Sequence, residues 1–244
     1  MTFGSLFSGI GGIDLGLERA GMTCKWQVEI DDFCQKVLTK HWPNVLKYKD
    51  IKEVQNLPYV DLIAGGFPCQ DISLAGKREG IKEGNRSGLW FEFAKIIRMV
   101  RSEYIILENV SGLLNNGMGT VLGDLATSGY DAEWQNLPAS SFGAPHRRER
   151  VFIVAYANSL GCGYTQKRRN KVPIFNGVLP QTLWPWISEP PLLRSDDGIP
   201  RRVAKLKALG NAVVPQVAEY IGKAIINSNQ CIQDDLPDKT PASA

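Results

Sequence analysis

Short apolar runs alternate along the first 157 residues with segments whose apolar positions recur at helical spacing. The predicted strands are 2–7, 25–30, 60–64, 104–107, 131–137 and 150–157, and the predicted helices are 13–20, 31–42, 89–100 and 120–128. Strands and helices that alternate in this way predict an α/β fold with a doubly wound, mostly parallel sheet.

The pattern changes beyond residue 157. Between 158 and 200 the periodicity fails, and glycine, proline, tryptophan and basic residues dominate, which indicates a small irregular lobe or a long surface connection. A helix is predicted to follow the segment 208–215 and to run through Ile226. From about Ser228 onward we expect a disordered tail.

The loop after the third predicted strand contains a cysteine. Gly65 and Gly66 break the strand, and Pro68 stiffens the turn that holds Cys69 at its tip. Open α/β sheets bind ligands outside the carboxyl ends of their strands, so this loop suits a nucleophile. An inert, buried thiol is the alternative interpretation, because free cysteine is usually buried.

Two further strand ends contain candidate ligand-binding residues. The turn Ser8-Gly9-Ile10-Gly11-Gly12 lies between a strand and a helix, as in nucleotide-binding turns, although such a turn can also serve only to pack the helix. Glu29 follows about twenty residues later, where an acid commonly binds ribose hydroxyls. Glu108 ends the strongly apolar strand 104–107.

A thiol, an acid and a nucleotide turn suit methyl transfer to carbon 5 of a pyrimidine. A thiolate that adds to ring carbon 6 makes carbon 5 nucleophilic, and an acid near ring nitrogen 3 stabilises the developing charge. The pKa of the thiol must then fall below its usual value of about 8.5. Arg148 and Arg150 are candidate sources of positive charge, and a solvated strand start is the alternative for both.

Several motifs, in the right order, resemble those of the DNA cytosine-5 methyltransferases along nearly the whole chain. They are Phe7-Ser8-Gly9-Ile10-Gly11-Gly12, Glu29, Asp50-Ile51, Gly66-Phe67-Pro68-Cys69-Gln70, Glu108-Asn109-Val110, His146-Arg147-Arg148-Glu149-Arg150 and Gly210-Asn211-Ala212-Val213-Val214-Pro215. The chain departs from the family at His146, where glutamine is usual. The family's ninth motif, which props up the target-recognition domain, is not recognisable.

The resemblance implies the S-adenosylmethionine-dependent methyltransferase fold and a role for each motif residue. The implied catalytic residues are Cys69, Glu108, Arg148 and Arg150. The implied cofactor-binding residues are Phe7, Ser8, Gly9, Ile10, Gly11, Gly12, Glu29, Ile30, Asp50, Ile51, Pro68, Asn211, Ala212 and Val213. The implied substrate-binding residues are Gly66, Phe67, Pro68, Gln70, Ser73, Asn109 and Val110.

The implied reaction is methyl transfer from S-adenosyl-L-methionine to carbon 5 of a flipped cytosine in double-stranded DNA, as in a restriction–modification system. Residues 1–157 would then form the catalytic and cofactor-binding domain, 158–200 a reduced target-recognition lobe, 201–227 a segment that completes the catalytic domain, and 228–244 the disordered tail. Methylation of a tRNA-like RNA and a catalytically idle DNA-binding protein are the alternative functions. An oxidoreductase ranks last, because nothing downstream of the glycine turn supplies nicotinamide-type chemistry.

Composition adds little to this interpretation. The chain has 43% hydrophobic and 22% charged residues, which is typical of a globular protein. From the sequence we expect neither a signal peptide nor an apolar run long enough to cross a bilayer. Its five cysteines include no Cys-x-x-Cys pair, so neither a disulfide framework nor a metal site is indicated. Basic clusters at 147–150, 166–171 and 201–202 suit a phosphate backbone. We expect a monomer in the cytoplasm of a bacterial or phage-infected cell, associated with the nucleoid in use.

Overall fold

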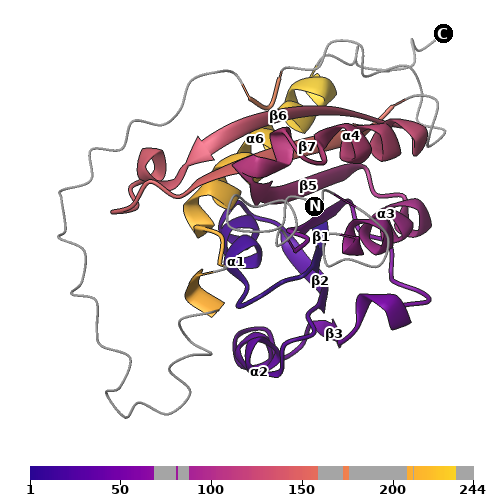
Figure 1. The fold of residues 1–244 in the computed structure, drawn as a ribbon, viewed down its shortest axis with the longest axis vertical. Coiled ribbons are helices and arrows are strands. Elements are labelled where there is room, and N and C mark those ends of the chain that lie inside the picture. The colour runs from indigo at the N-terminus through magenta and orange to yellow at the C-terminus, as the bar shows by residue number, and fades with distance from the viewer. Residues whose placement is uncertain (69–80, 82–87, 159–172, 176–207, 211, 235–244) are drawn as a thin grey trace, which may run out of the picture.

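A seven-stranded sheet forms the centre of the computed structural model, which describes residues 1–68, 81, 88–158, 173–175, 208–210 and 212–234 (Figure 1). Its strands are β1 (Thr2–Leu6), β2 (Thr23–Val28), β3 (Leu46–Tyr48), β4 (Leu62–Gly65), β5 (Tyr104–Val110), β6 (Tyr130–Pro138) and β7 (Glu149–Ala157). They lie in the order β3-β2-β1-β4-β5-β7-β6, and β7 alone runs antiparallel to its two neighbours. The predicted mostly parallel α/β sheet is confirmed.

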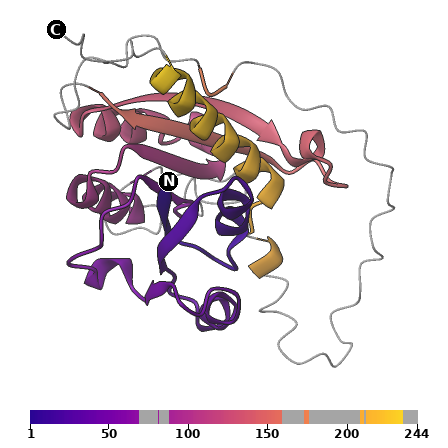
Figure 2. The same cartoon turned by 180° about the vertical axis from the view of Figure 1, so that it is seen from behind.

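Helices cover both faces of this sheet. The helices are α1 (Gly12–Arg19), α2 (Asp32–His41), α3 (Leu89–Val100), α4 (Met118–Thr127) and α6 (Pro215–Asp234), with short 3-10 turns η1 (Ile51–Glu53), η2 (Ser111–Leu114) and η3 (Ala139–Phe142). Buried side chains of α3 and α4 form one core with the sheet, and those of α1, α2 and α6 form another. Figure 2 shows α6 crossing the sheet beside α1.

Glycines allow α1 and α6 to pack closely. A β-carbon on Gly16 of α1 would lie 2.3 Å from the carbonyl oxygen of Pro215, and one on Gly222 of α6 would lie 2.8 Å from the Ala20 Cβ. Both distances are shorter than real contacts allow. The last helix therefore lies directly over the helix that follows the glycine turn, and it brings the preceding segment to the same edge of the sheet.

The strand order places a ligand site between β1 and β4. The chain winds from β1 through β2 to β3 on one side, and then returns to β4 and β5 on the other. The two windings diverge from a crevice at the carboxyl ends of β1 and β4, where open α/β sheets bind ligands. The glycine turn follows β1, and the predicted nucleophile loop follows β4.

The structure corrects several sequence predictions: most predicted strand and helix bounds shift by one to three residues, and Glu108 lies within β5 rather than at its end. Gly65 belongs to β4, so the strand ends one residue later than expected, and β3 and η1 form where no regular element was predicted. The predicted disorder from Ser228 is wrong for residues 228–234, because α6 continues to Asp234. Buried Ile225 extends the apolar face of this helix, and the Tyr104 hydroxyl donates to Asn229 Oδ1 at 2.6 Å.

Other predictions fall outside the described residues. These are Cys69, Gln70, Ser73, Asn211, nearly all of the lobe at 158–200, residues 201–207 of the segment predicted to complete the catalytic domain, and the tail from 235. Among the helices that the structure describes, none combines the length and apolar character needed to cross a membrane.

Candidate active site

The carboxyl ends of β1, β2, β4 and β5 open onto a cavity of about 570 Å³. Cofactor and small-molecule sites commonly enclose about 300–1,000 Å³. The predicted residues that line this cavity are Phe7, Ser8, Gly9, Gly12, Glu29, Ile30, Gly66, Phe67, Pro68, Glu108, Asn109, Val110, Arg148, Arg150, Ala212 and Val213. Residues predicted from separate motifs therefore meet in one space.

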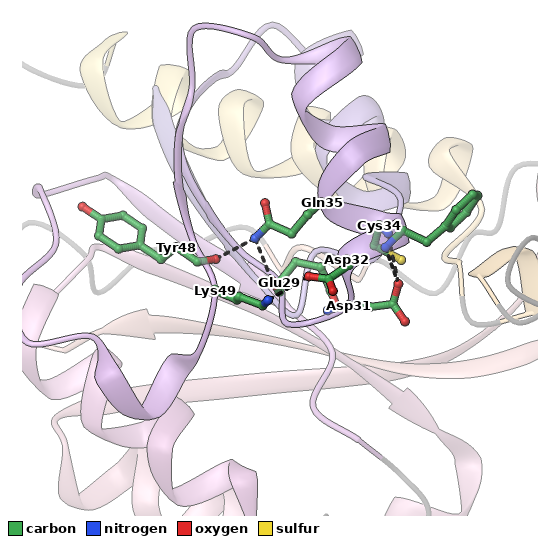
Figure 3. A network of polar contacts seen from close by, with 8 residues as sticks. Glu29, Asp31, Asp32, Cys34, Gln35, Tyr48 and Lys49 are labelled. Carbon is green, nitrogen blue, oxygen red and sulfur yellow. Dashed lines mark hydrogen bonds and ion pairs between the residues drawn. The ribbon is translucent and has the colours of Figure 1, made fainter.

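Glu29 joins the glycine turn to the start of α2. Its Oε2 accepts a hydrogen bond from the Gly9 N–H at 2.7 Å, and its Oε1 accepts one from the Asp31 N–H at 2.8 Å. The Gln35 side chain donates to the backbone carbonyls of Glu29 and Tyr48, at 2.7 and 2.9 Å (Figure 3). The position of the carboxylate at the end of β2 is thus fixed from several sides.

The segment before α6 closes the cavity over the glycine turn. A β-carbon on Gly12 would lie 2.3 Å from the Val213 carbonyl oxygen. Gly9 has a φ of 57°, a left-handed conformation that suits glycine. Phe7 has a φ of 53°, which is strained for a residue with a side chain. These positions explain why the turn needs glycines and how residues some 200 positions apart share one site.

Glu108 forms the acidic end of the cavity. Its side chain is 12% exposed, and Arg150 Nε lies 3.1 Å from its Oε1. Burial raises the pKa of Glu108, and the charges of Arg150 and Arg148 oppose that rise without cancelling it. A β-carbon on Gly66 would lie 2.6 Å from Glu108 Oε2, so glycine lets the predicted nucleophile loop lie against the acid.

Asn109 and Arg148 hold other parts of the site in place. Asn109 is 2% exposed, and its Nδ2 donates to the Phe67 carbonyl at 3.1 Å. Its Oδ1 accepts from the Val110 N–H at 2.9 Å. Arg148 Nη1 donates to the Gly210 carbonyl at 2.5 Å. Asn109 thus anchors the loop that leads to Cys69, and Arg148 anchors the last motif.

Four of the described candidates do not line the cavity. Asp50 caps η1 by accepting from the Lys52 N–H at 2.9 Å, and Ile51 is buried in the core. Ile10 also lies away from the lining, and a β-carbon on Gly11 would lie 2.5 Å from the Trp42 ring. Their assignment to cofactor binding stays a prediction.

Sequence reasoning missed four lining residues, which are Ile13, Asp31, Cys34 and Ala208. Asp31 had a usable signal, because an aspartate at the start of a predicted helix is a favoured N-cap, and its Oδ1 does accept from the Phe33 and Cys34 N–H groups. Nothing in the local sequence of Cys34 distinguishes it from a packing or surface residue. Within the described residues, no group of three or more His, Cys, Asp or Glu is placed to hold a metal ion.

Comparison with known proteins agrees with this geometry. The sequence profile described as C-5 cytosine-specific DNA methylase matches residues 1–190. The chain is 42% identical over 159 residues to the type II methyltransferase M2.BsuMI of Bacillus subtilis, an alignment that covers 62% of this chain and 41% of that protein. It is 33% identical over 218 residues to the type II methyltransferase M.BsuFI of the same species, an alignment that covers 83% of this chain and 53% of that protein.

Solved structures agree as well. A protein described as a DNA modification methyltransferase encoded within an Escherichia coli prophage superposes with a TM-score of 0.53 at 27% identity, over 66% of this chain and 47% of that one. The chain spans about half the length, or less, of these relatives. The profile match extends over more than three quarters of the chain, and on this evidence the chain belongs to the C-5 cytosine-specific DNA methylase family.

Proposed function

We propose that the chain transfers a methyl group from S-adenosyl-L-methionine to carbon 5 of cytosine in double-stranded DNA. The observation that carries this proposal is the shared cavity, in which the glycine turn and Glu29 meet the Glu108–Arg150 pair and the loop that leads to Cys69. Family membership supports the reaction class, and the descriptions of the family and of the prophage-encoded structure support DNA as the substrate.

The cofactor would occupy the half of the cavity near β1 and β2. Glu29 lies there with its carboxylate at the end of a strand, in the position of ribose-binding acids. The Ile30 side chain is 61% exposed and offers an apolar surface to a base. The volume and these groups fit an adenosyl cofactor, which would supply an electrophilic methyl group.

The cytosine would occupy the half near Glu108. With its pKa raised by burial, Glu108 can hold a proton and donate it toward ring nitrogen 3, while Arg150 keeps the carboxyl group oriented. The Cys69 thiolate would form a bond to ring carbon 6, and carbon 5 would then take the methyl group. Loss of the carbon 5 proton releases the sulfur from carbon 6 and restores the aromatic ring.

Access to the ring requires that the base leave the duplex. Carbon 6 is shielded within the stack, so the target nucleotide must be flipped into the cavity. We assign the catalytic domain to residues 1–157 and 201–227, and base reading to residues 158–200. A monomer in the bacterial cytoplasm, associated with the nucleoid, would suffice for this reaction.

Methyl transfer from labelled S-adenosylmethionine tests the proposal directly. Purified protein should label cytosine-containing duplex DNA and leave a tRNA pool unlabelled, and Cys69→Ser should abolish the transfer. Bisulfite sequencing of DNA from expressing cells would identify the modified cytosine and its sequence context. Absence of transfer to any cytosine-containing DNA, or full activity of the serine variant, would refute the proposal.

A further inference from the structure

Four aromatic rings connect the glycine turn to the loop that precedes Cys69. The ring centroids of Phe7 and Phe93 lie 6.2 Å apart, those of Phe93 and Trp90 lie 5.9 Å apart, and those of Trp90 and Phe67 lie 5.4 Å apart. Each separation falls within the range of about 4.5–7 Å for interacting aromatic pairs. We call Phe7, Phe93, Trp90 and Phe67 the ring chain.

The two ends of the ring chain line the cavity, and its two middle members do not. Phe7 belongs to the glycine turn after β1, and Phe67 belongs to the loop after β4. Trp90 and Phe93 both come from α3 and are fully buried. The ring chain is therefore a continuous packed path whose middle runs through the core beside the cavity. It joins the half of the cavity assigned to the cofactor to the loop that precedes Cys69.

The middle rings are tightly held. The Trp90 indole N–H donates to Asp124 Oδ2 of α4 at 2.7 Å. A β-carbon on Gly65 would lie 3.1 Å from the Phe93 ring, so this ring packs directly against the end of β4. Close-packed interiors transmit displacements, because they contain few voids that could absorb them.

Both ends can respond to a ligand. The left-handed φ of Phe7 is unfavourable for a residue with a side chain and persists because packing holds the residue there. A ligand that contacts Phe7 therefore acts on a backbone already held away from its preferred conformations. Phe67 is held at its carbonyl by Asn109, and its ring rests on Trp90. The next residues along the chain are Pro68 and Cys69.

We propose that the ring chain couples cofactor binding to the position of residues 66–68, which precede Cys69 in the chain. A ligand held against Phe7 shifts Phe67 through Phe93 and Trp90, and the reactivity of Cys69, two residues later in the sequence, reports that shift. Trp90 and Phe93 are positioning residues, since neither lines the cavity. The inference rests on the proposed function for the identity of the ligand and for the role of Cys69.

The rate of Cys69 alkylation measures this coupling. Iodoacetamide modification of the Cys69 peptide is followed by mass spectrometry, with and without saturating S-adenosylhomocysteine. Binding sites that are coupled commonly alter each other about 5- to 150-fold, so the wild-type rate should change at least about fivefold. In Phe93→Leu the change should fall below about twofold. Phe3→Leu is the matched control, because Phe3 is equally buried but belongs to the core on the other face of the sheet, and it should keep the wild-type ratio.

A second pair of variants tests the same path without altering a ring. Asp124→Ala removes the acceptor of the Trp90 indole and should lower the ratio, whereas Asp124→Asn keeps an oxygen acceptor and should preserve it. The coupling would be overturned if S-adenosylhomocysteine left the alkylation rate of wild-type Cys69 unchanged. It would also be overturned if the ratio of the rates with and without ligand were the same in Phe93→Leu and Asp124→Ala as in the wild type. A different result would refute the proposed function, namely methyl transfer that persists after complete alkylation of Cys69.

Discussion

Replacement of Asp14 by asparagine should stabilise the protein in a pH-dependent manner. Asp14 lies in the first turn of α1 with no exposed surface, and accepts hydrogen bonds from the Ser5 hydroxyl at 3.1 Å and the Gln27 amide at 2.8 Å. None of these partners is a cation. Burial therefore raises the pKa of Asp14 from 3.8 to about 6, and its hydrogen bonds only partly offset the rise.

The sign follows from the two pKa values. The unfolded chain releases the Asp14 proton near pH 3.8, while the folded protein retains it until about pH 6. The contribution of this group to the free energy of unfolding is thus fully present below pH 3.8 and is lost as the pH rises through 6. At about 1.4 kcal/mol per pH unit, the loss amounts to about 3 kcal/mol. The total free energy of unfolding of a typical domain is only about 5–15 kcal/mol.

Asp14→Asn removes the charge and keeps the shape. The new amide can still accept from Gln27, and Ser5 can reverse its hydrogen bond to accept. The difference in free energy of unfolding between variant and wild type should therefore rise by about 2–3 kcal/mol from pH 4 to pH 8. Urea unfolding at several pH values, followed by tryptophan fluorescence, would measure it, and the m-values should stay equal.

Glu53→Gln is the matched control, because Glu53 is an exposed acid that is not among the groups acting on Asp14. Its stability difference from wild type should vary by less than about 0.5 kcal/mol over the same range, as expected for a surface substitution. A difference for Asp14→Asn that is flat with pH, or that falls toward pH 8, would show that Asp14 does not bind its proton more tightly in the folded protein.

Three further predictions concern the site and the last helix. Glu108→Gln should lower the rate of methyl transfer about 10²- to 10⁴-fold, which is the usual contribution of proton transfer, while the cofactor affinity measured by calorimetry stays unchanged. A loss of less than about twofold would refute the role of the acid. Gly12→Ala should weaken cofactor binding at least about tenfold, because its β-carbon would lie 2.3 Å from the Val213 carbonyl, whereas Gly119→Ala, with open space around it, should leave binding unchanged. Tyr104→Phe should lower the free energy of unfolding by about 1 kcal/mol through loss of the bond to Asn229, and this effect should be smaller in an Asn229→Ala background, where the hydroxyl keeps its interaction with Ser228.

Elements with a strong local signal were predictable from the sequence. Residues 89–100 were predicted as a helix, and α3 has those bounds, because its apolar residues recur at helical spacing over three turns. The three-residue β3 lacks such a pattern and forms through its pairing with β2. The end of α6 escaped prediction for the same reason, since Asn229 meets Tyr104 from 125 positions away.

The site was predictable as a set of motifs but not as a set of contacts. Spacing correctly paired Glu29 with the glycine turn, which it meets at the Gly9 N–H. Spacing could not show that Val213 packs on Gly12, or that the amide of Asn109 is bonded to the Phe67 carbonyl and the Val110 N–H. These contacts depend on the packing of distant segments, which no local pattern records.

Asp14 and Glu108 show how one physical effect has two consequences. Burial is the largest cause of the raised pKa in both cases. Asp14 is sealed beneath the glycine turn among neutral partners, so its charge at neutral pH lowers stability without contacting a ligand. Glu108 lines the cavity, and Arg150 beside it moderates the cost of ionisation. Replacement of the carboxyl group by an amide should therefore stabilise the protein at Asp14 with methyl transfer retained, whereas at Glu108 it should abolish most of the transfer, because the proton donor is lost.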